Sequence, residues 1–251
     1  MPDVEEARRI SFDVLDSTNA EAMRRARAGE RGALWIVAAR QSAGRGRHGR
    51  TWDSRTGNLY ATLLVTLPAP AHIAAQTSFV AALAVFDTAA GALAAPDRLA
   101  LKWPNDVLLG GRKLSGILIE TVAQDLPERT TVAIGIGVNL VHAPDHTRYG
   151  ATSLSQHGAF VEPGAAFSML AAALHRRLAD WNDGGNFALI RSEWMARAAG
   201  LGCPASVTLG GRTVTGEFRG LASDGALLLS EAGGQLHAIH AGEVSLALEA
   251  S

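Results

Sequence analysis

The rhythm of hydrophobic and polar positions changes along the chain, and these changes predict where helices and strands lie. Thr18 and Glu21 have capping-box spacing, and Gly29 follows where a first helix would end. Short apolar runs bounded by polar or turn-forming residues are typical of strands, and longer alanine-rich or amphipathic stretches are typical of helices. Strands are therefore predicted at 34–39, 59–67, 99–102, 107–109, 113–121 and 130–138, and helices at 17–28, 73–93, 165–181 and 187–198.

After Gly200 the predicted elements become shorter and more closely spaced along the chain. Short strands separated by glycine-containing turns are typical of a small barrel. Such strands are predicted at 207–209, 212–218, 226–229, 237–240 and 244–248. Because Gly200, Gly202 and Pro204 cluster ahead of them, we expect one domain over residues 1–199 and a second over residues 200–251.

Composition narrows the class of protein. The 251 residues carry 23 Lys and Arg against 24 Asp and Glu, whereas a protein whose whole surface binds nucleic acid is strongly basic. Cys203 is the single cysteine, so no intramolecular disulfide and no cysteine-based zinc site can form. The N-terminus lacks an apolar signal segment, and Gln76 and Asp87 interrupt the apolar stretch 73–95, which favours a buried helix over a membrane span. We expect a soluble cytoplasmic protein with no membrane contact.

A glycine-rich loop follows the strand predicted at 34–39. Gly44, Gly46 and Gly49 match the dinucleotide-binding fingerprint G-x-G-x-x-G, which requires a helix directly after the loop and an acidic residue about 20 positions on. Another strand follows instead, and the acidic residue is missing. The sequence therefore disfavours a dinucleotide site.

The other positions of this loop hold Arg45, Arg47, His48 and Arg50, and no Asp or Glu occurs from residue 31 to 52. Guanidinium groups bind phosphate or carboxylate through paired hydrogen bonds. We expect the loop to be disordered when empty and to close over an anionic ligand. A solvated basic loop or a nucleic-acid-binding arm is the alternative, and we assign His48 no role.

Further polar residues lie at the ends of predicted elements. Lys113 heads an apolar strand face, where it either reaches solvent or faces an anion, and Gly116 permits a ligand to approach the backbone. The segment 16–19 places hydroxyls and an amide at a helix N-terminus, which suits either oxygen ligands or capping by Thr18. Asn139 stands at the end of a predicted strand, where it is either a turn residue or a contact to a nucleotide.

Taken together and in this order, these motifs resemble the biotin–protein ligase family. The resemblance is dense over residues 16–140 and weaker around 219–228. It rests on Ser17-Thr18-Asn19, Gln41, the GRGRHGR loop with Trp52, the KWPND turn at 102–106, KLSGILIE at 113–120 and GIGVN at 135–139. It implies an α+β fold: a class II synthetase-like mixed β-sheet with helices mainly on one face, plus a small C-terminal SH3-like β-barrel.

The resemblance also implies a reaction in two steps. The carboxylate of biotin attacks the α-phosphate of Mg²⁺-bound ATP, giving biotinyl-5′-AMP and pyrophosphate. A lysine of a biotin carboxyl carrier protein, such as that of acetyl-CoA carboxylase, then takes the biotin. The alternatives are a lipoate or octanoate ligase of the same fold and a non-catalytic nucleic-acid-binding protein.

The roles implied by the resemblance are assigned by motif position. The catalytic residues are Lys113, Arg47 and Asp106. The biotin pocket comprises Ser17, Thr18, Asn19, Gln41, Gly44, Arg45, Gly46, Arg47, Lys113 and Gly116. The ATP or adenylate is bound by Arg45, Arg47, Arg50, Trp52, Lys102, Asn105 and Asn139. Mg²⁺ is held mainly by the phosphates of ATP.

Two further expectations concern partners and metals. Only sixteen residues precede Ser17, too few for a winged helix-turn-helix, so the chain resembles the monofunctional class that does not bind DNA. Family dimers form through sheet edges, and either a monomer or a homodimer is compatible with the sequence. No H-E-x-x-H motif occurs, and His142 and His146 lack convincing further ligands, so a zinc site is not expected.

Overall fold

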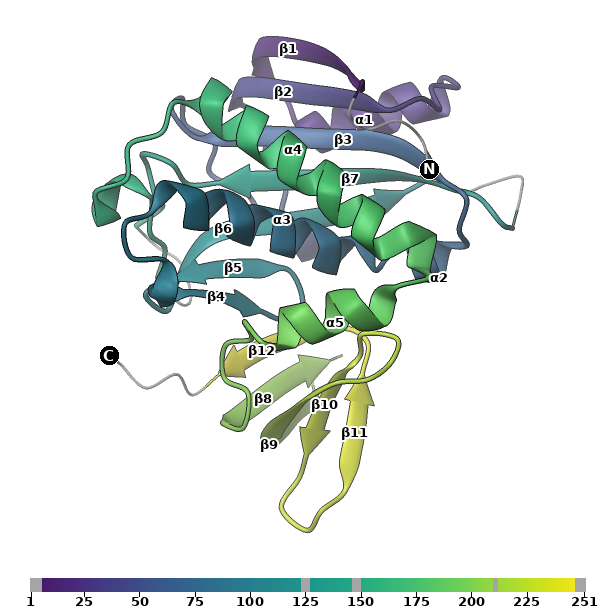
Figure 1. Ribbon diagram of the computed structural model, residues 1–251, viewed down its shortest axis with the longest axis vertical. Helices are drawn as coiled ribbons and strands as arrows, with labels where there is room; N and C mark the ends of the chain where they lie inside the picture. The colour runs from purple at the N-terminus through teal and green to yellow at the C-terminus, as the bar shows by residue number, and fades with distance from the viewer. Residues whose placement is uncertain (1–5, 123–126, 146–149, 210–211, 247–251) are drawn as a thin grey trace.

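The larger of two β-sheets forms the centre of the computed structural model, which describes residues 6–122, 127–145, 150–209 and 212–246 (Figure 1). Its strand order is β1-β2-β3-β7-β6-β5-β4. β1 runs parallel to β2 and the other neighbours are antiparallel, so the sheet is mixed, as expected. The strands are β1 (Arg8–Leu15), β2 (Leu34–Gln41), β3 (Leu59–Leu67), β4 (Leu99–Lys102), β5 (Asp106–Leu109), β6 (Arg112–Thr121) and β7 (Thr130–Val138).

Most of the helices cover one face of this sheet (Figure 1). On that face lie α2 (Ala71–Ala74), α3 (Thr77–Ala92), α4 (Pro163–Trp181) and α5 (Phe187–Met195). The opposite face is covered by α1 (Thr18–Arg27). Because successive side chains of a strand point to opposite faces, Leu63 packs with the first group of helices and Leu64 packs with α1. This arrangement confirms the expected fold class.

The apolar segment 71–92 is a core element. It is long and apolar enough to cross a membrane by length and composition, but it is mostly buried inside the fold. Leu83 and Ala84 of α3 are fully buried in the main hydrophobic core. The interpretation as a buried helix agrees with this packing.

A five-stranded antiparallel sheet follows near the C-terminus, in the order β11-β10-β9-β8-β12. Its strands are β8 (Pro204–Leu209), β9 (Arg212–Leu221), β10 (Leu227–Ser230), β11 (Leu236–Ile239) and β12 (Glu243–Leu246). It packs against the larger part of the chain, where Trp103 Nε1 donates to the carbonyl of Gly225 at 3.1 Å. The sheet is consistent with the expected SH3-like module, although residues 247 and 248 of the last predicted strand lie outside the described residues.

Several elements differ from those predicted. β8 begins three residues before the strand predicted at 207–209, and β9 ends three residues after the strand predicted at 212–218. β1 was not predicted; it is an edge strand in which Ile10, Phe12 and Leu15 are partly buried and pack on the core. The helix predicted at 73–93 is divided into α2 and α3 around Gln76, and Thr77 Oγ1 donates to the carbonyl of Ala74 at 2.7 Å. α5 ends at Met195, three residues before the predicted end.

Arg177 joins the three long helices that cover the sheet. From α4 its guanidinium donates to Asp87 of α3 at 2.8 and 3.1 Å and to Glu193 of α5 at 2.8 Å. These hydrogen bonds, together with the two carboxylate charges, outweigh burial and raise the pKa of Arg177. With 12% of its side chain exposed, Arg177 is the partly buried centre of a charge network.

We predict that Arg177→Met lowers the free energy of unfolding by about 1–3 kcal/mol, because it leaves two partly buried carboxylates without their cation. Urea denaturation followed by tryptophan fluorescence measures the change. The matched control is Arg8→Met, which removes the ion pair of a 62%-exposed arginine with Glu30 and should change stability by less than about 1 kcal/mol. Equal effects of the two substitutions would contradict the assigned importance of Arg177.

Candidate active site

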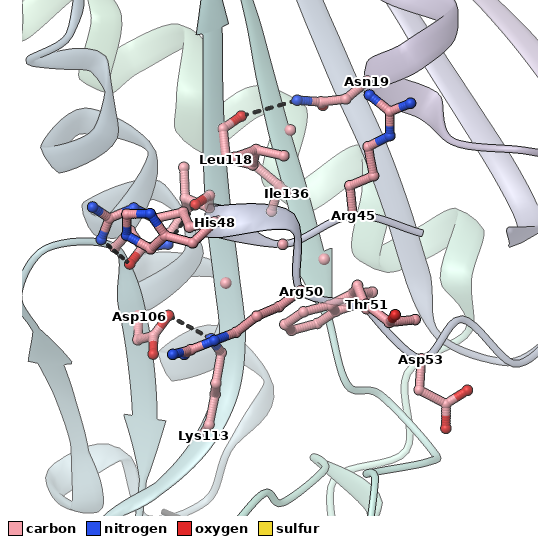
Figure 2. Close-up of a pocket in the computed structure, with 18 of the residues that line it drawn as sticks. Asn19, Arg45, His48, Arg50, Thr51, Asp53, Asp106, Lys113, Leu118 and Ile136 are labelled. Atoms are coloured by element: carbon pink, nitrogen blue, oxygen red, sulfur yellow. Dashed lines mark hydrogen bonds and ion pairs between the residues drawn. The ribbon is translucent and has the colours of Figure 1, made fainter. Parts of the chain in front are cut away.

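A cleft of about 580 Å³ opens between the loop after β2, the β4–β5 turn, strands β6 and β7, and the C-terminal sheet (Figure 2). A volume of this size is typical of small-molecule sites. Of the predicted site residues the following line it: Ser17, Thr18, Asn19, Gln41, Arg45, Gly46, Arg47, Arg50, Trp52, Lys102, Asn105, Asp106, Lys113, Gly116 and Asn139. The fold thus brings together motifs that are up to 122 positions apart, counted from Ser17 to Asn139 (139 − 17).

Gly44 is the predicted site residue that does not line the cleft. It is buried, and a Cβ there would lie 2.5 Å from both Ser54 Oγ and the carbonyl of Trp52. Glycine is needed at this position because two backbone segments approach each other closely beneath the loop. Gly44 therefore shapes the base of the loop.

Ser17, and not Thr18, caps α1. Its φ of −158° is extended, and its Oγ accepts from the N–H of Ala20 at 3.4 Å. Thr18 is consequently the first helical residue, and its N–H donates to Gln41 Oε1 at 2.8 Å. Gln41 Nε2 donates in turn to Ser54 Oγ at 2.9 Å, so the side chain that faces the cleft is fixed from both sides.

Thr62 connects the polar residues at this end of the cleft. Its buried hydroxyl lies 2.7 Å from Asn19 Oδ1 and 2.8 Å from Thr18 Oγ1. Because an amide oxygen cannot donate, the Thr62 proton goes to Asn19. Asn19 Nδ2 donates to Glu120 Oε2 at 2.9 Å and to the carbonyl of Leu118 at 3.2 Å. This end is therefore preorganised by uncharged hydrogen-bonding groups with one carboxylate behind them.

The glycine–arginine loop forms a compact hairpin in the structure. The N–H of Gly46 donates to the carbonyl of Arg50 at 2.7 Å, and the N–H of Trp52 donates to Gly44 at 2.9 Å. Figure 2 shows Arg45 directed towards Asn19, while Arg50 extends towards Asp106 and Lys113. The loop thus carries positive charge to both ends of the cleft, and its ordering by a ligand stays a prediction.

Arg47 is a half-buried cation at the centre of the site. Burial lowers its pKa, and the negative charge of Asp106 partly offsets that effect. Its hydrogen bond is to a neutral group, Asn105 Oδ1, at 3.3 Å. Asn105 is itself held by its Nδ2, which donates to the carbonyl of Ile117 at 2.6 Å. A partly desolvated guanidinium of this kind favours an anionic ligand beside it.

Lys113 lies between a carboxylate and an indole. Its Nζ is 2.6 Å from Asp106 Oδ1 and 5.3 Å from the ring centroid of Trp52. The indole lies against Gly116 and Gly137, which are paired on β6 and β7, and a Cβ at Gly137 would be 2.6 Å from the ring. These two glycines make the slot for Trp52 and so determine where the ammonium of Lys113 stands.

Asn139 holds the strand that carries Lys113. Its Nδ2 donates to the carbonyl of Thr152 at 3.0 Å and to that of Lys113 at 3.4 Å. Lys102, by contrast, is a buried lysine of the cleft wall, with 5% of its surface exposed. Their predicted contacts to the nucleotide stay predictions.

Tyr60, Pro144, Gly242 and Val244 are among the cleft residues that were not predicted. Burial raises the pKa of Tyr60 to about 12, so it remains a neutral phenol, and it donates to the carbonyl of Arg55 at 2.8 Å. Pro144 lines the cleft from the loop after β7. Gly242 and Val244 line it from the C-terminal sheet, a contribution that no local motif indicates. Thr62, which does not line the cleft, was not predicted either; it is one of two threonines in the strand β3.

The carboxylates on the cleft wall suit the predicted mode of Mg²⁺ binding. Asp53 and Asp106 line the cleft, and Mg²⁺ typically combines one or two carboxylates with water and substrate phosphates. Among the described residues no group of three His, Cys, Asp or Glu side chains could hold a metal by itself. His146, which was considered for zinc, lies outside the described residues.

Comparison with known proteins agrees with this geometry. Residues 11–139 match the model of the Biotin/lipoate A/B protein ligase family, and residues 201–247 match the model of the Biotin protein ligase C terminal domain. The solved structure of the biotin protein ligase from Aquifex aeolicus in complex with biotin and ATP superposes with a TM-score of 0.79. It is 27% identical and covers 96% of this chain and 99% of its own.

Two curated relatives are similar over most of their length. The biotin–[acetyl-CoA-carboxylase] ligase of Paracoccus denitrificans is 45% identical over 85% of this chain and 90% of the relative. That of Mycobacterium tuberculosis is 35% identical over 91% of this chain and 85% of the relative. The chain therefore belongs to the biotin/lipoate A/B protein ligase family, among its biotin–protein ligases.

Proposed function

We propose that this protein is an ATP-dependent biotin–protein ligase, which forms biotinyl-5′-AMP and transfers biotin to a lysine of a biotin carboxyl carrier protein. The observation that carries the proposal is one cleft with two chemically different ends. A hydrogen-bonding network of uncharged side chains lies at α1, with Arg45 directed towards it, whereas Arg50 and Lys113 lie at the other end beside Asp106. Arg47 stands between them in the cleft, beside Asn105. Such a cleft suits a ligand that joins an uncharged polar ring to a phosphate.

The neutral end would hold the ring of biotin. The ureido group of that ring has amide-like donors and an acceptor, and it needs fixed hydrogen-bonding partners in place of water. Thr18, Asn19 and Gln41 supply such partners, with orientations fixed by the contacts described above. Burying these groups without a partner is unfavourable, so the network selects a ligand that satisfies them.

The charged end would bring the biotin carboxylate to the α-phosphate. Two unit negative charges 4 Å apart repel by about 4 kcal/mol at an effective dielectric of 20. Arg47 and Lys113 would offset this repulsion and stabilise the charge that develops as the carboxylate attacks and pyrophosphate leaves. Mg²⁺, brought by ATP, supplies further positive charge at the phosphates, and Asp53 and Asp106 would face it.

Asp106 would serve the second step as well. The attacking lysine of the acceptor must lose its proton before its amine can attack the adenylate. The carboxylate of Asp106, which is held against Lys113 at 2.6 Å, lies beside the proposed position of the mixed anhydride and can orient the amine. Lys113 would stabilise the departing AMP.

The surroundings of the enzyme follow from the same proposal. Because the two relatives described above are biotin–[acetyl-CoA-carboxylase] ligases, acetyl-CoA carboxylase is the first acceptor to test. We further propose a cytoplasmic enzyme, monomer or homodimer, without DNA or membrane binding, because the balanced charge provides no broad basic surface.

Pyrophosphate exchange tests the proposed reaction. We expect labelled pyrophosphate to enter ATP when biotin and Mg²⁺ are present, because adenylate formation is reversible. Parallel reactions with lipoate and with octanoate identify the acid that is activated. Exchange with lipoate but not with biotin would contradict the proposal, and salt-sensitive DNA or RNA binding without any exchange would favour the nucleic-acid alternative.

Lys113→Ala should reduce the rate of adenylate formation on the order of a thousandfold, because it removes a positioned cation from the developing charge. Single-turnover formation of biotinyl-5′-AMP measures this rate. Arg112→Ala is the matched control, since its exposed side chain neighbours Lys113 on the same strand and does not line the cleft. Full activity of the Lys113 variant would overturn its proposed role.

Arg47→Ala should speed release of the adenylate by roughly 10- to 100-fold, since charge-assisted hydrogen bonds to a phosphate are among the stronger polar contacts. Trapping of released biotinyl-5′-AMP, followed by chromatography, measures the rate. Arg40→Ala, an exposed change in β2 ahead of the loop and outside the cleft, serves as the control. An unchanged release rate in the Arg47 variant would exclude it as a ligand of the adenylate.

A further inference from the structure

Asn58 uses both ends of its side chain on a single stretch of backbone. It lies just before β3 and is 3% exposed. Its Oδ1 accepts from the N–H groups of Leu140, Val141 and His142 at 3.0, 2.9 and 3.0 Å. Its Nδ2 donates to the carbonyl of His142 at 2.8 Å. All four of these hydrogen bonds go to the loop that follows β7.

Three consecutive N–H groups that converge on one point form a nest, an arrangement that typically binds an anion. Here a neutral amide oxygen occupies it. If that oxygen were removed, the three N–H groups would lose their shared partner: that of Leu140 is buried, and those of Val141 and His142 are partly buried. The loop would then have to move to satisfy the buried group. The conformation of residues 140–142 therefore depends on Asn58.

This loop connects two positions on the wall of the cleft. It begins after Asn139 and reaches Pro144, and both residues line the cleft. On its other side, Ser155 donates from its N–H to the carbonyl of Leu140 at 2.9 Å and from its Oγ to that of Val141 at 3.0 Å. Asn58 supplies the bonds from the opposite direction.

Asn58 also belongs to the segment that leaves the glycine–arginine loop. Trp52, which lies in the cleft beside Lys113, is six positions earlier in the chain (58 − 52). Gly57 lies against the same loop, since a Cβ there would be 3.6 Å from the side chain of Val141. One amide therefore joins the segment after Trp52 to the loop that carries Pro144.

We propose that Asn58 is a positioning residue for the nucleotide end of the cleft, which it shapes without touching the substrate. This inference rests on the proposed function, because it assigns ATP to the end that contains Trp52 and Lys113. The neutral end depends on Thr62, Gln41 and α1, to which Asn58 makes no described bond. Its effect is therefore selective for ATP.

Asn58→Ala should raise the KM for ATP at least roughly tenfold, since a shift of about 1 Å caused by a distant substitution can cost on the order of 100-fold. The KM for biotin should stay within about twofold, because the neutral network keeps its bonds. Pyrophosphate exchange at varied ATP and varied biotin measures both constants. Amide hydrogen exchange over residues 139–145 should become faster in the free protein, and this second measurement needs no activity.

Thr66→Val is the matched control. It removes another buried hydrogen bond of β3, which joins Thr66 Oγ1 to Thr131 Oγ1 at 2.9 Å. This bond lies at the end of β3 that is far from Asn58. It should leave both KM values and the exchange of 139–145 unchanged. Equal ATP constants and equal amide exchange in the Asn58 and Thr66 variants would overturn the inference.

Asn58→Asp provides a second variant if Asn58→Ala does not fold. It keeps an acceptor for the three N–H groups and loses the donor to His142, so its KM for ATP should lie between those of the wild type and Asn58→Ala. A wild-type value in Asn58→Asp together with unchanged amide exchange would also overturn the inference. If the wild-type protein showed no biotin-dependent pyrophosphate exchange, the proposed function would be overturned instead. Amide hydrogen exchange would still test whether Asn58 stabilises the loop.

Discussion

Positive charge held partly out of water is the constraint on which the rest of the cleft depends. Burial lowers the pKa of Arg47, and the hydrogen bond of its guanidinium is to the neutral oxygen of Asn105. Lys113 stands between Asp106 and the face of Trp52. Cations with little hydration attract an entering anion strongly, because less water must be displaced and the local dielectric is low. The negative charge of Asp106 partly offsets these cations until an anion binds.

The position of that charge depends in turn on two glycines. Gly116 and Gly137 face each other across β6 and β7, and side chains there would push the indole of Trp52 out of its slot. The sheet itself is held from both faces, by α1 on one side and by the helices joined through Arg177 on the other. Because the sheet is fixed and has no side chains at these two glycines, the indole of Trp52 and the ammonium of Lys113 can lie close together.

Much of this architecture was predictable from the sequence, for a physical reason. β3 and β7 are buried on both faces, so they appear as continuous apolar runs, and the predicted bounds 59–67 and 130–138 agree with the structure. β1 was not predicted, although apolar and polar residues alternate over 10–14 in a way that is typical of a strand with one buried face. The motif residues that gather in the cleft were predictable, because unusual residue types recur there at characteristic spacings.

The supporting residues were not predictable in the same way. Thr18 was assigned the cap of α1, but the neighbouring Ser17 takes the cap and Thr18 turns to Gln41. Thr62 and Asn58 have their partners more than 40 positions away, so no local pattern reveals them. A sequence motif identifies the groups that meet a ligand, whereas the fold decides which other side chains hold those groups in place.

The two ends of the cleft are supported by different kinds of structure, and this difference suits a two-step reaction. The neutral network is anchored on regular elements, α1, β3 and β6, which are among the most stable parts of a fold. The charged end includes loops as well as strands, and amide side chains such as Asn105 and Asn58 help to hold those loops. Loops held in this way can move at modest cost, and a charged end that moves can admit ATP and later the lysine of an acceptor protein. The rigid end meanwhile keeps its ligand oriented through both steps, so that movement at one end of the cleft does not disturb binding at the other.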